Sequence, residues 1–143
     1  MFIGGFVIAG ALEGAVPLPP VSGKPLRVVE LTFGWLLLAL GASLYVTAIA
    51  ALRRAHTAVL PGDSATQLVT SGPYRFSRNP AYLGLAIVWC AVAALLNWGW
   101  PILLLPAVVI GQQLFVIRTE ERHLAEMFGE AYSAYCRRVR RWL

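Results

Sequence analysis

The stretch that decides the fold is VVELTFGWLLLALGASLYVTAIAAL, which runs from Val28 to Leu52. Its only charged residue is Glu30. A helix that crosses a bilayer needs about 20 predominantly apolar residues, so this stretch is ample. It also carries small residues, which favour close contact with a neighbouring helix. These are Gly34, Ala39, Gly41, Ala42 and Ser43.

Three other apolar stretches, 2–16, 81–98 and 101–117, extend this pattern, although the first and last are marginal in length. The first has no basic residue before it and no small-residue cleavage pattern after it, so we interpret it as a short span and not as a signal peptide. Between the last two, Asn97-Trp98-Gly99-Trp100-Pro101 predicts a tight turn with tryptophans at the membrane surface. The sequence therefore predicts a single all-α membrane domain (1–143) of about four transmembrane helices.

Composition supports this prediction. Of the 143 residues, 58% are hydrophobic and 13% charged, and the mean hydropathy is +0.66. A soluble chain this small could not bury so much apolar surface, because its surface-to-volume ratio is too high. A bilayer solves the problem and leaves the net charge of +5 to the loops and tails. Cys90 and Cys136 form no disulfide framework and are typical of thiols in a reducing compartment.

Arginines predict the orientation. They concentrate in the loop 53–80 and the tail 118–143, whereas the opposite side has only Lys24 and Arg27. The positive-inside rule places the loop, the tail and both termini in the cytoplasm, and we expect a bacterial inner membrane. Glu13 and Glu30 then lie near the outer ends of the first two spans, where we expect interfacial ion pairs with Lys24 and Arg27.

The tail has apolar and aromatic residues at steps of three and four, with arginines on the other face. The stripe consists of Leu124, Phe128, Tyr132, Tyr135, Val139 and Trp142. It predicts an amphipathic helix that Gly129 can divide into two pieces. Such a helix either lies along an anionic membrane surface or folds back over the cytoplasmic loop.

The chain lacks the motifs of several common sites. His56 and His123 are its only histidines and have no partner at metal-ligand spacing, so no metal site is expected. There is no GxGxxG element, P-loop or nucleophile elbow, and nucleic acid is not an expected partner.

Two stretches are more informative. The first, LVTSGPYRFSRNPAYLG (68–84), combines turn-forming, aromatic and basic residues just before a span. Its composition fits a membrane boundary, yet it also suits the wrapping of a small polar ligand, and backbone N–H groups near Gly72 could bind an anion. The second, RTEERHL (118–124), has no attractive i,i+4 pair, since Arg118 faces Arg122. We therefore expect a ligand or loop partner for Arg118 and Glu120.

Together these stretches resemble the isoprenylcysteine carboxyl methyltransferase and phospholipid methyltransferase superfamily of membrane enzymes. The resemblance runs from about Arg53 to the C-terminus. Its first motif is Leu68–Tyr74 followed by Arg78–Gly84. Its second consists of Glu120-Glu121, Leu124, Phe128-Gly129-Glu130, Tyr132, Tyr135 and Arg137-Arg138-Val139.

The resemblance implies S-adenosylmethionine as the methyl donor, bound on the cytoplasmic side, and an amphiphilic or small apolar acceptor reached from the membrane lipids. It implies a cofactor pocket formed by Leu68, Val69, Gly72, Tyr74, Asn79, Pro80, Tyr82 and Glu121. It also implies catalytic roles for Glu120, as proton acceptor from an amine, and for Arg118, as an orienting group for an acidic acceptor.

Two positions depart from the family pattern. Asn79 stands where many members have histidine before the proline, and asparagine does not titrate near neutral pH. Thr66 stands where eukaryotic members have histidine. Both departures argue against a prenylated cysteine carboxylate as the acceptor. Two alternatives stay open at this point: a membrane reductase that uses NADPH, since sterol reductases resemble the same C-terminal region, and a non-catalytic membrane protein.

Overall fold

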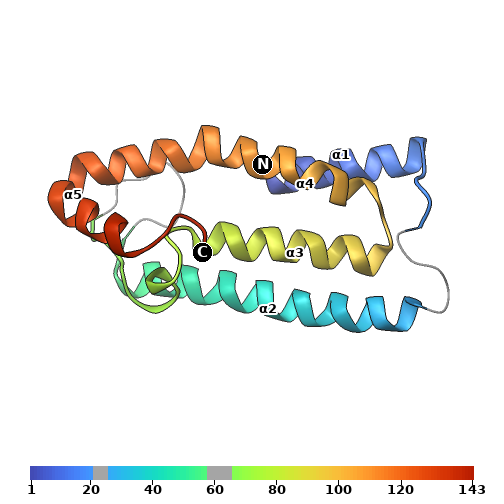
Figure 1. Cartoon of the computed structure of the whole chain (residues 1–143), viewed down its shortest axis with the longest axis horizontal. Coiled ribbons are helices and arrows are strands. Elements are labelled where there is room, and N and C mark those ends of the chain that lie inside the picture. The colour runs from blue at the N-terminus through green and yellow to red at the C-terminus, as the bar shows by residue number, and fades with distance from the viewer. Residues whose placement is uncertain (21–25, 58–65) are drawn as a thin grey trace. The chain divides into compact units, whose positions relative to one another are not determined.

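The computed structural model describes residues 1–20, 26–57 and 66–143, and within these residues it contains helices and no strand (Figure 1). The all-α prediction is therefore confirmed for the described residues. The helices are α1 (Phe2–Ala15), α2 (Arg27–Arg54), α3 (Pro80–Leu96), α4 (Trp100–Gly111) and α5 (Arg118–Arg138). A 3-10 turn, η2 (Gly72–Arg75), precedes α3, and a π-helical segment, η3 (Gln112–Ile117), joins α4 to α5.

Two helices are long and apolar enough to cross a membrane: α2 and the continuous helix Trp100–Arg138. Only 11% and 17% of their most apolar windows are buried inside the protein. Phe33, Trp35 and Leu36 of α2, for example, are each 62% exposed. A helix with so much exposed apolar surface requires an apolar surrounding, as a bilayer provides. The helices α1 and α3 are apolar but shorter.

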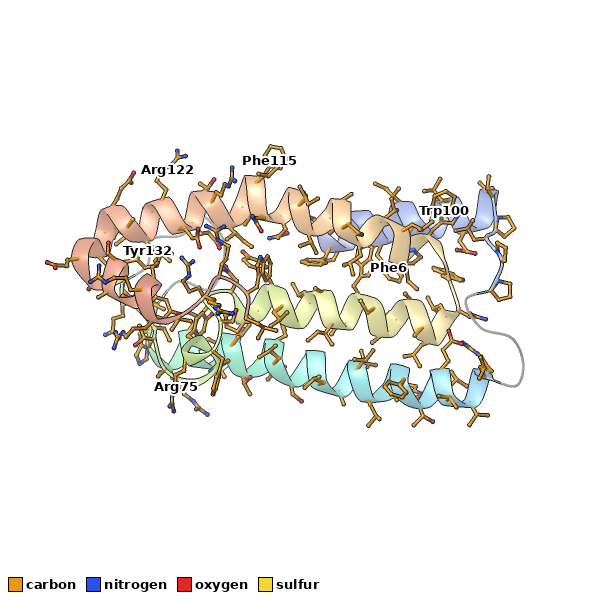
Figure 2. The ribbon with its side chains drawn as sticks, viewed as in Figure 1. Phe6, Arg75, Trp100, Phe115, Arg122 and Tyr132 are labelled. Atoms are coloured by element: carbon orange, nitrogen blue, oxygen red, sulfur yellow. The ribbon has the colours of Figure 1, made fainter. Side chains whose placement is uncertain are left out.

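The chain divides into two compact units, residues 1–42 with 84–111 and residues 43–83 with 112–143. In the first unit α1 packs along α4 (Figure 1). Phe6 of α1, which is labelled in Figure 2, meets Trp89 of α3 edge-on, with ring centroids 5.0 Å apart. Trp89 Nε1 donates a hydrogen bond of 2.7 Å to Pro101 O. A Cβ added to Gly41 of α2 would lie 2.8 Å from Gly84 O. The small residues of α2 thus allow close contact with α3, as predicted.

The ends of the first unit are tied by polar contacts. Arg27 forms a salt bridge of 2.8 Å with Glu30 and donates to the carbonyls of Ala94 and Leu95 in the last turn of α3. The predicted Arg27–Glu30 pair is thus confirmed. Glu13 instead accepts hydrogen bonds from backbone N–H groups, and Lys24 lies outside the described residues. The predicted turn between α3 and α4 is present, with Asn97 in the left-handed conformation (φ 58°).

In the second unit α5 changes direction at Gly129, whose φ of 50° and ψ of −118° are not helical. The predicted division of the tail helix at this glycine is confirmed. The helix ends at Arg138, and Val139 is extended, so the expected helical stripe is wrong for Val139 and Trp142. The last residues instead return to the segment before α3, because Arg78 N–H donates to Arg140 O (Figure 1).

Candidate functional site

The first feature of the site is a hydrogen bond between Tyr82 and Glu120 in the second unit. Tyr82 lies in the first turn of α3 and Glu120 in the first turn of α5. The Tyr82 hydroxyl donates to Glu120 Oε1 over 2.8 Å. The side chain of Gln112, at the start of η3 and almost fully buried, lies near the Tyr82 hydroxyl. A π-helical turn is often found at functional sites because it shifts the side chains out of α-helical register.

Two further tyrosines lie nearby: Tyr74, whose phenol is close enough to be affected by the charge of Glu120, and Tyr135, which contacts Tyr74. The Tyr135 hydroxyl donates to Tyr74 O over 2.8 Å and so holds η2 against α5. Burial raises the pKa of the Tyr74 phenol well above its usual range, and its neighbours Tyr135 and Glu120 add to the effect. Burial raises the pKa of Tyr135 to about 12, although the charge of Arg78 opposes it. Both phenols are therefore neutral at physiological pH.

Glu120 lies beyond the apolar part of its helix and is partly buried. Burial raises the pKa of its carboxyl, and the hydrogen bond from Tyr82 acts in the opposite direction. No arginine, lysine or histidine forms a salt bridge with Glu120 in the described part of the chain. A partly buried carboxylate surrounded by phenols becomes more stable when a cation arrives, because the cation offsets the lost hydration.

Glu121, the next residue, has the opposite surroundings. Its carboxylate forms salt bridges with Arg78 (3.0 Å) and Arg141 (2.7 Å), and Arg141 contacts both of its oxygens. Arg78 Nη1 also lies 3.0 Å from Cys136 Sγ. The pKa of Arg141 is raised, mainly by its hydrogen bond to Glu121. We call Arg78, Glu121 and Arg141 the ion-pair triad; it links the loop before α3, the start of α5 and the C-terminus.

The C-terminal residues are held to the same loop through their backbone. Asn79 Nδ2 and Ser77 Oγ donate to Arg141 O over 3.1 and 3.2 Å. Both Ser77 and Asn79 are buried, at 2% and 8% exposure. Trp142 Nε1 donates to Gln113 Oε1 over 3.1 Å. We call residues 139–142 the C-terminal strap, because it covers the loop that leads into α3.

The second unit also contains an open cleft of about 540 Å³ between the end of α2 and η2. It is lined by Thr47, Ala50, Ala51, Arg54, Ala55, Ser71, Gly72 and Pro73.

The sequence model of the phospholipid methyltransferase family matches residues 29–131. The chain belongs to this family. The matched range contains every candidate residue from Leu68 to Glu121, and membership indicates a membrane methyltransferase. Neither a curated protein nor a solved structure matches the chain.

The structure brings some of the predicted residues of this family member together. Tyr82 donates a hydrogen bond to Glu120, and Tyr74 lies close enough for the charge of Glu120 to raise the pKa of its phenol. Asn79 donates a hydrogen bond to the C-terminal strap, and Glu121 is the carboxylate of the ion-pair triad. Pro80 is buried at the start of α3. These three support the start of α3, which carries Tyr82.

Others lie apart from Glu120. Gly72, with a φ of 60°, lines the cleft at the end of α2. Leu68 and Val69 are partly buried in the irregular segment before it. Arg118 is exposed and has no salt bridge within the described residues. Arg122 projects away from the protein in Figure 2. Residues four apart share one face of a helix, so Arg118 lies on that same outer face.

Sequence reasoning missed Gln112, Arg78 and Arg141 as members of the site. Gln112 had a usable signal, since Gln112-Gln113 is a polar pair inside the apolar stretch 101–117. Polar side chains in a membrane span are costly and usually functional. Arg78 belongs to the first motif of the resemblance but, like Arg141, it was counted only among the arginines that predict orientation.

Proposed function

We propose that this protein transfers a methyl group from S-adenosylmethionine to an amphiphilic acceptor, with donor and acceptor meeting beside Tyr82 and Glu120. One observation carries the proposal: the Glu120 carboxylate is partly buried, accepts a hydrogen bond from Tyr82 and has no salt bridge in the described residues. Such a group favours a ligand with a positive charge.

The residues present fit this cofactor, which supplies a methyl group on a cationic sulfonium. A sulfonium is stabilised by aromatic faces and by a nearby carboxylate. Tyr74, Tyr82 and Tyr135 offer phenol rings, and Glu120 offers the negative charge. The neutral phenols leave that charge uncompensated until the ligand binds.

The chain's own groups then have defined roles. The ion-pair triad and the strap hold the loop, so that Tyr82 keeps Glu120 oriented. Glu120 Oε2, which is not bonded to Tyr82, would take the proton that an amine acceptor releases when it is methylated. The rest of the rate enhancement comes from holding the methyl donor and the acceptor in position and from excluding water. For an acidic acceptor, Arg118 remains the proposed orienting group.

We further propose four spans, formed by α1, α2, α3 and the helix that begins at Trp100, with the loop, the tail and both termini in the cytoplasm of a bacterial inner membrane. The arginine distribution supports this orientation. Burial of Tyr132 and Tyr135 supports a tail that folds over the cytoplasmic loop. The cofactor then enters from the cytosol and the acceptor from the lipid.

Calorimetry and a transfer assay test the proposal. The purified full chain in detergent should bind S-adenosylmethionine and should label a component of a membrane extract when the methyl group is isotopically marked. Glu120→Gln should lose both properties, whereas Glu130→Gln, an exposed residue of the same helix, should keep them. Binding of NADPH in place of S-adenosylmethionine, or full activity of Glu120→Gln, would overturn the proposal.

A further inference from the structure

The cleft between the end of α2 and η2 has a cationic side. Arg54 lines it, is exposed, and forms no salt bridge with any described carboxylate. Among the described residues, the lining contains no acidic side chain. Ser71, just before η2, also lines the cleft, and its hydroxyl can donate a hydrogen bond. Arg54 and Ser71 therefore suit a ligand group with a negative charge and several oxygen acceptors.

The rest of the lining is mainly apolar and made of small residues. It includes Ala50 and Ala51 of α2, Ala55 just after this helix, and Pro73 of η2. Gly72, in the left-handed conformation, brings η2 close to α2: a Cβ on Gly72 would lie 4.0 Å from the Ala51 Cβ. The Thr47 hydroxyl, one turn earlier, is turned into its own helix, where it donates to Ser43 O. These small groups leave room for an alkyl chain.

The order of these residues along α2 indicates where the apolar part and the charged part of a ligand would lie. Ala50 and Ala51 lie near the end of the apolar part of α2, which is one of the candidate membrane spans. Arg54 is the last residue of this helix. A molecule in the cleft would therefore meet apolar groups at the depth of the span and a cation where the span ends. That sequence matches an amphiphile at a membrane surface.

We propose that this cleft binds an anionic amphiphile, with its phosphate or carboxylate on Arg54 and Ser71 and the first part of its tail along Ala50, Ala51 and Ala55. The site is independent of the proposed methyl transfer, since none of the residues beside Glu120 takes part in it. It gives the protein a preference for anionic over zwitterionic lipids.

Calorimetry of the full chain in a non-ionic detergent tests the site. Dihexanoyl phosphatidylglycerol, an anionic lipid with short chains, should bind at least about tenfold more tightly than dihexanoyl phosphatidylcholine. Glycerol phosphate, which lacks the tail, should bind more weakly than the anionic lipid. Octanoate distinguishes the two sources of the charge: if it binds as tightly, the cleft accepts carboxylates as well as phosphates, and if it does not, the cleft is selective for phosphate. Equal binding of the two lipids would overturn the proposal.

The chain offers a matched control, because Arg53 is adjacent, exposed and not part of the lining. Arg54→Gln should weaken binding of the anionic lipid at least about tenfold, whereas Arg53→Gln should leave it within about twofold. Equal losses in the two variants would mean diffuse surface attraction and would overturn the site. Ala50→Leu, which retains every charge and favours the helix, should also weaken lipid binding by filling the cleft. Unchanged binding in a folded Ala50→Leu protein would show that the tail of the ligand does not lie along Ala50 and would overturn the proposed site.

Discussion

Tyr82 and Glu120 are 38 residues apart in sequence, yet the hydroxyl of one donates to the carboxylate of the other over 2.8 Å. The contact joins the first turn of α3 to the first turn of α5. It also satisfies one oxygen of a carboxylate that has no salt bridge among the described residues. The charge and protonation of Glu120 thus depend on Tyr82, and this dependence can be measured.

The first prediction concerns Tyr82→Phe. The hydrogen bond from Tyr82 lowers the pKa of Glu120 against the larger effect of burial. Its removal should raise that pKa further and shift the acid limb of the methyl-transfer profile to higher pH. Rates measured between pH 5 and 9 would reveal the shift. Tyr45→Phe, on an exposed tyrosine of α2, should leave the profile in place. An unshifted profile in Tyr82→Phe would contradict the role of this contact.

The second prediction concerns the loss of methyl transfer at acidic pH in the wild-type protein. Glu120 acts as proton acceptor only when ionised, and burial favours its neutral form, so its pKa lies above the ordinary 4.5. Transfer should therefore be present above that raised pKa and be lost as the pH falls through it. The free energy of unfolding changes in the opposite direction. Because the folded state holds the proton of Glu120 more tightly than the unfolded state, the contribution of this group to stability falls as the pH rises from 4.5. Glu120→Gln should lower transfer by about 10²-fold or more and remove this limb. An acid limb that persists in Glu120→Gln would assign it to another group.

Sequence reasoning reached part of this site for a physical reason. Within residues 118–124 there is no attractive i,i+4 pair, and this absence predicted a ligand or loop partner for Glu120 and Arg118. Glu120 has that partner in Tyr82, while Arg118 is exposed. The difference follows from helix geometry, because residues two apart in a helix point in different directions.

The rest of the site could not be read from the sequence. The strap is held mainly by the carbonyls of Arg140 and Arg141, and every residue has a backbone carbonyl. Nothing in the residue types therefore indicates which carbonyls Ser77, Arg78 and Asn79 contact. The apolar stretches, by contrast, predicted helices well, because length and hydropathy are properties of the segment itself.

The third prediction concerns the ion-pair triad. Glu121→Gln leaves Arg78 and Arg141 without their shared carboxylate, and Arg78 has 16% and Glu121 15% of the side chain exposed. Loss of one partner of a largely buried pair is costly, so the free energy of unfolding should fall by about 1–3 kcal/mol. Thermal unfolding in detergent would measure the change. Glu126→Gln, exposed on the same helix, should have little effect. Equal melting temperatures for the two variants would mean that the triad adds nothing to stability.

The last prediction concerns the close contact of α2 and α3. A Cβ at Gly41 would lie 2.8 Å from Gly84 O and 2.9 Å from Val88 N, and both are backbone atoms that cannot rotate away. Gly41→Ala should therefore push the helices apart and lower the free energy of unfolding by about 1–3 kcal/mol, even though alanine favours a helix by up to about 1 kcal/mol. Gly14→Ala is the matched control, because nothing lies within 4 Å of its added Cβ. Without a steric cost only the helix preference remains, so Gly14→Ala should raise the melting temperature in detergent or leave it unchanged. A higher melting temperature for Gly41→Ala as well would show that α2 and α3 do not approach as closely as Gly41 and Gly84 indicate.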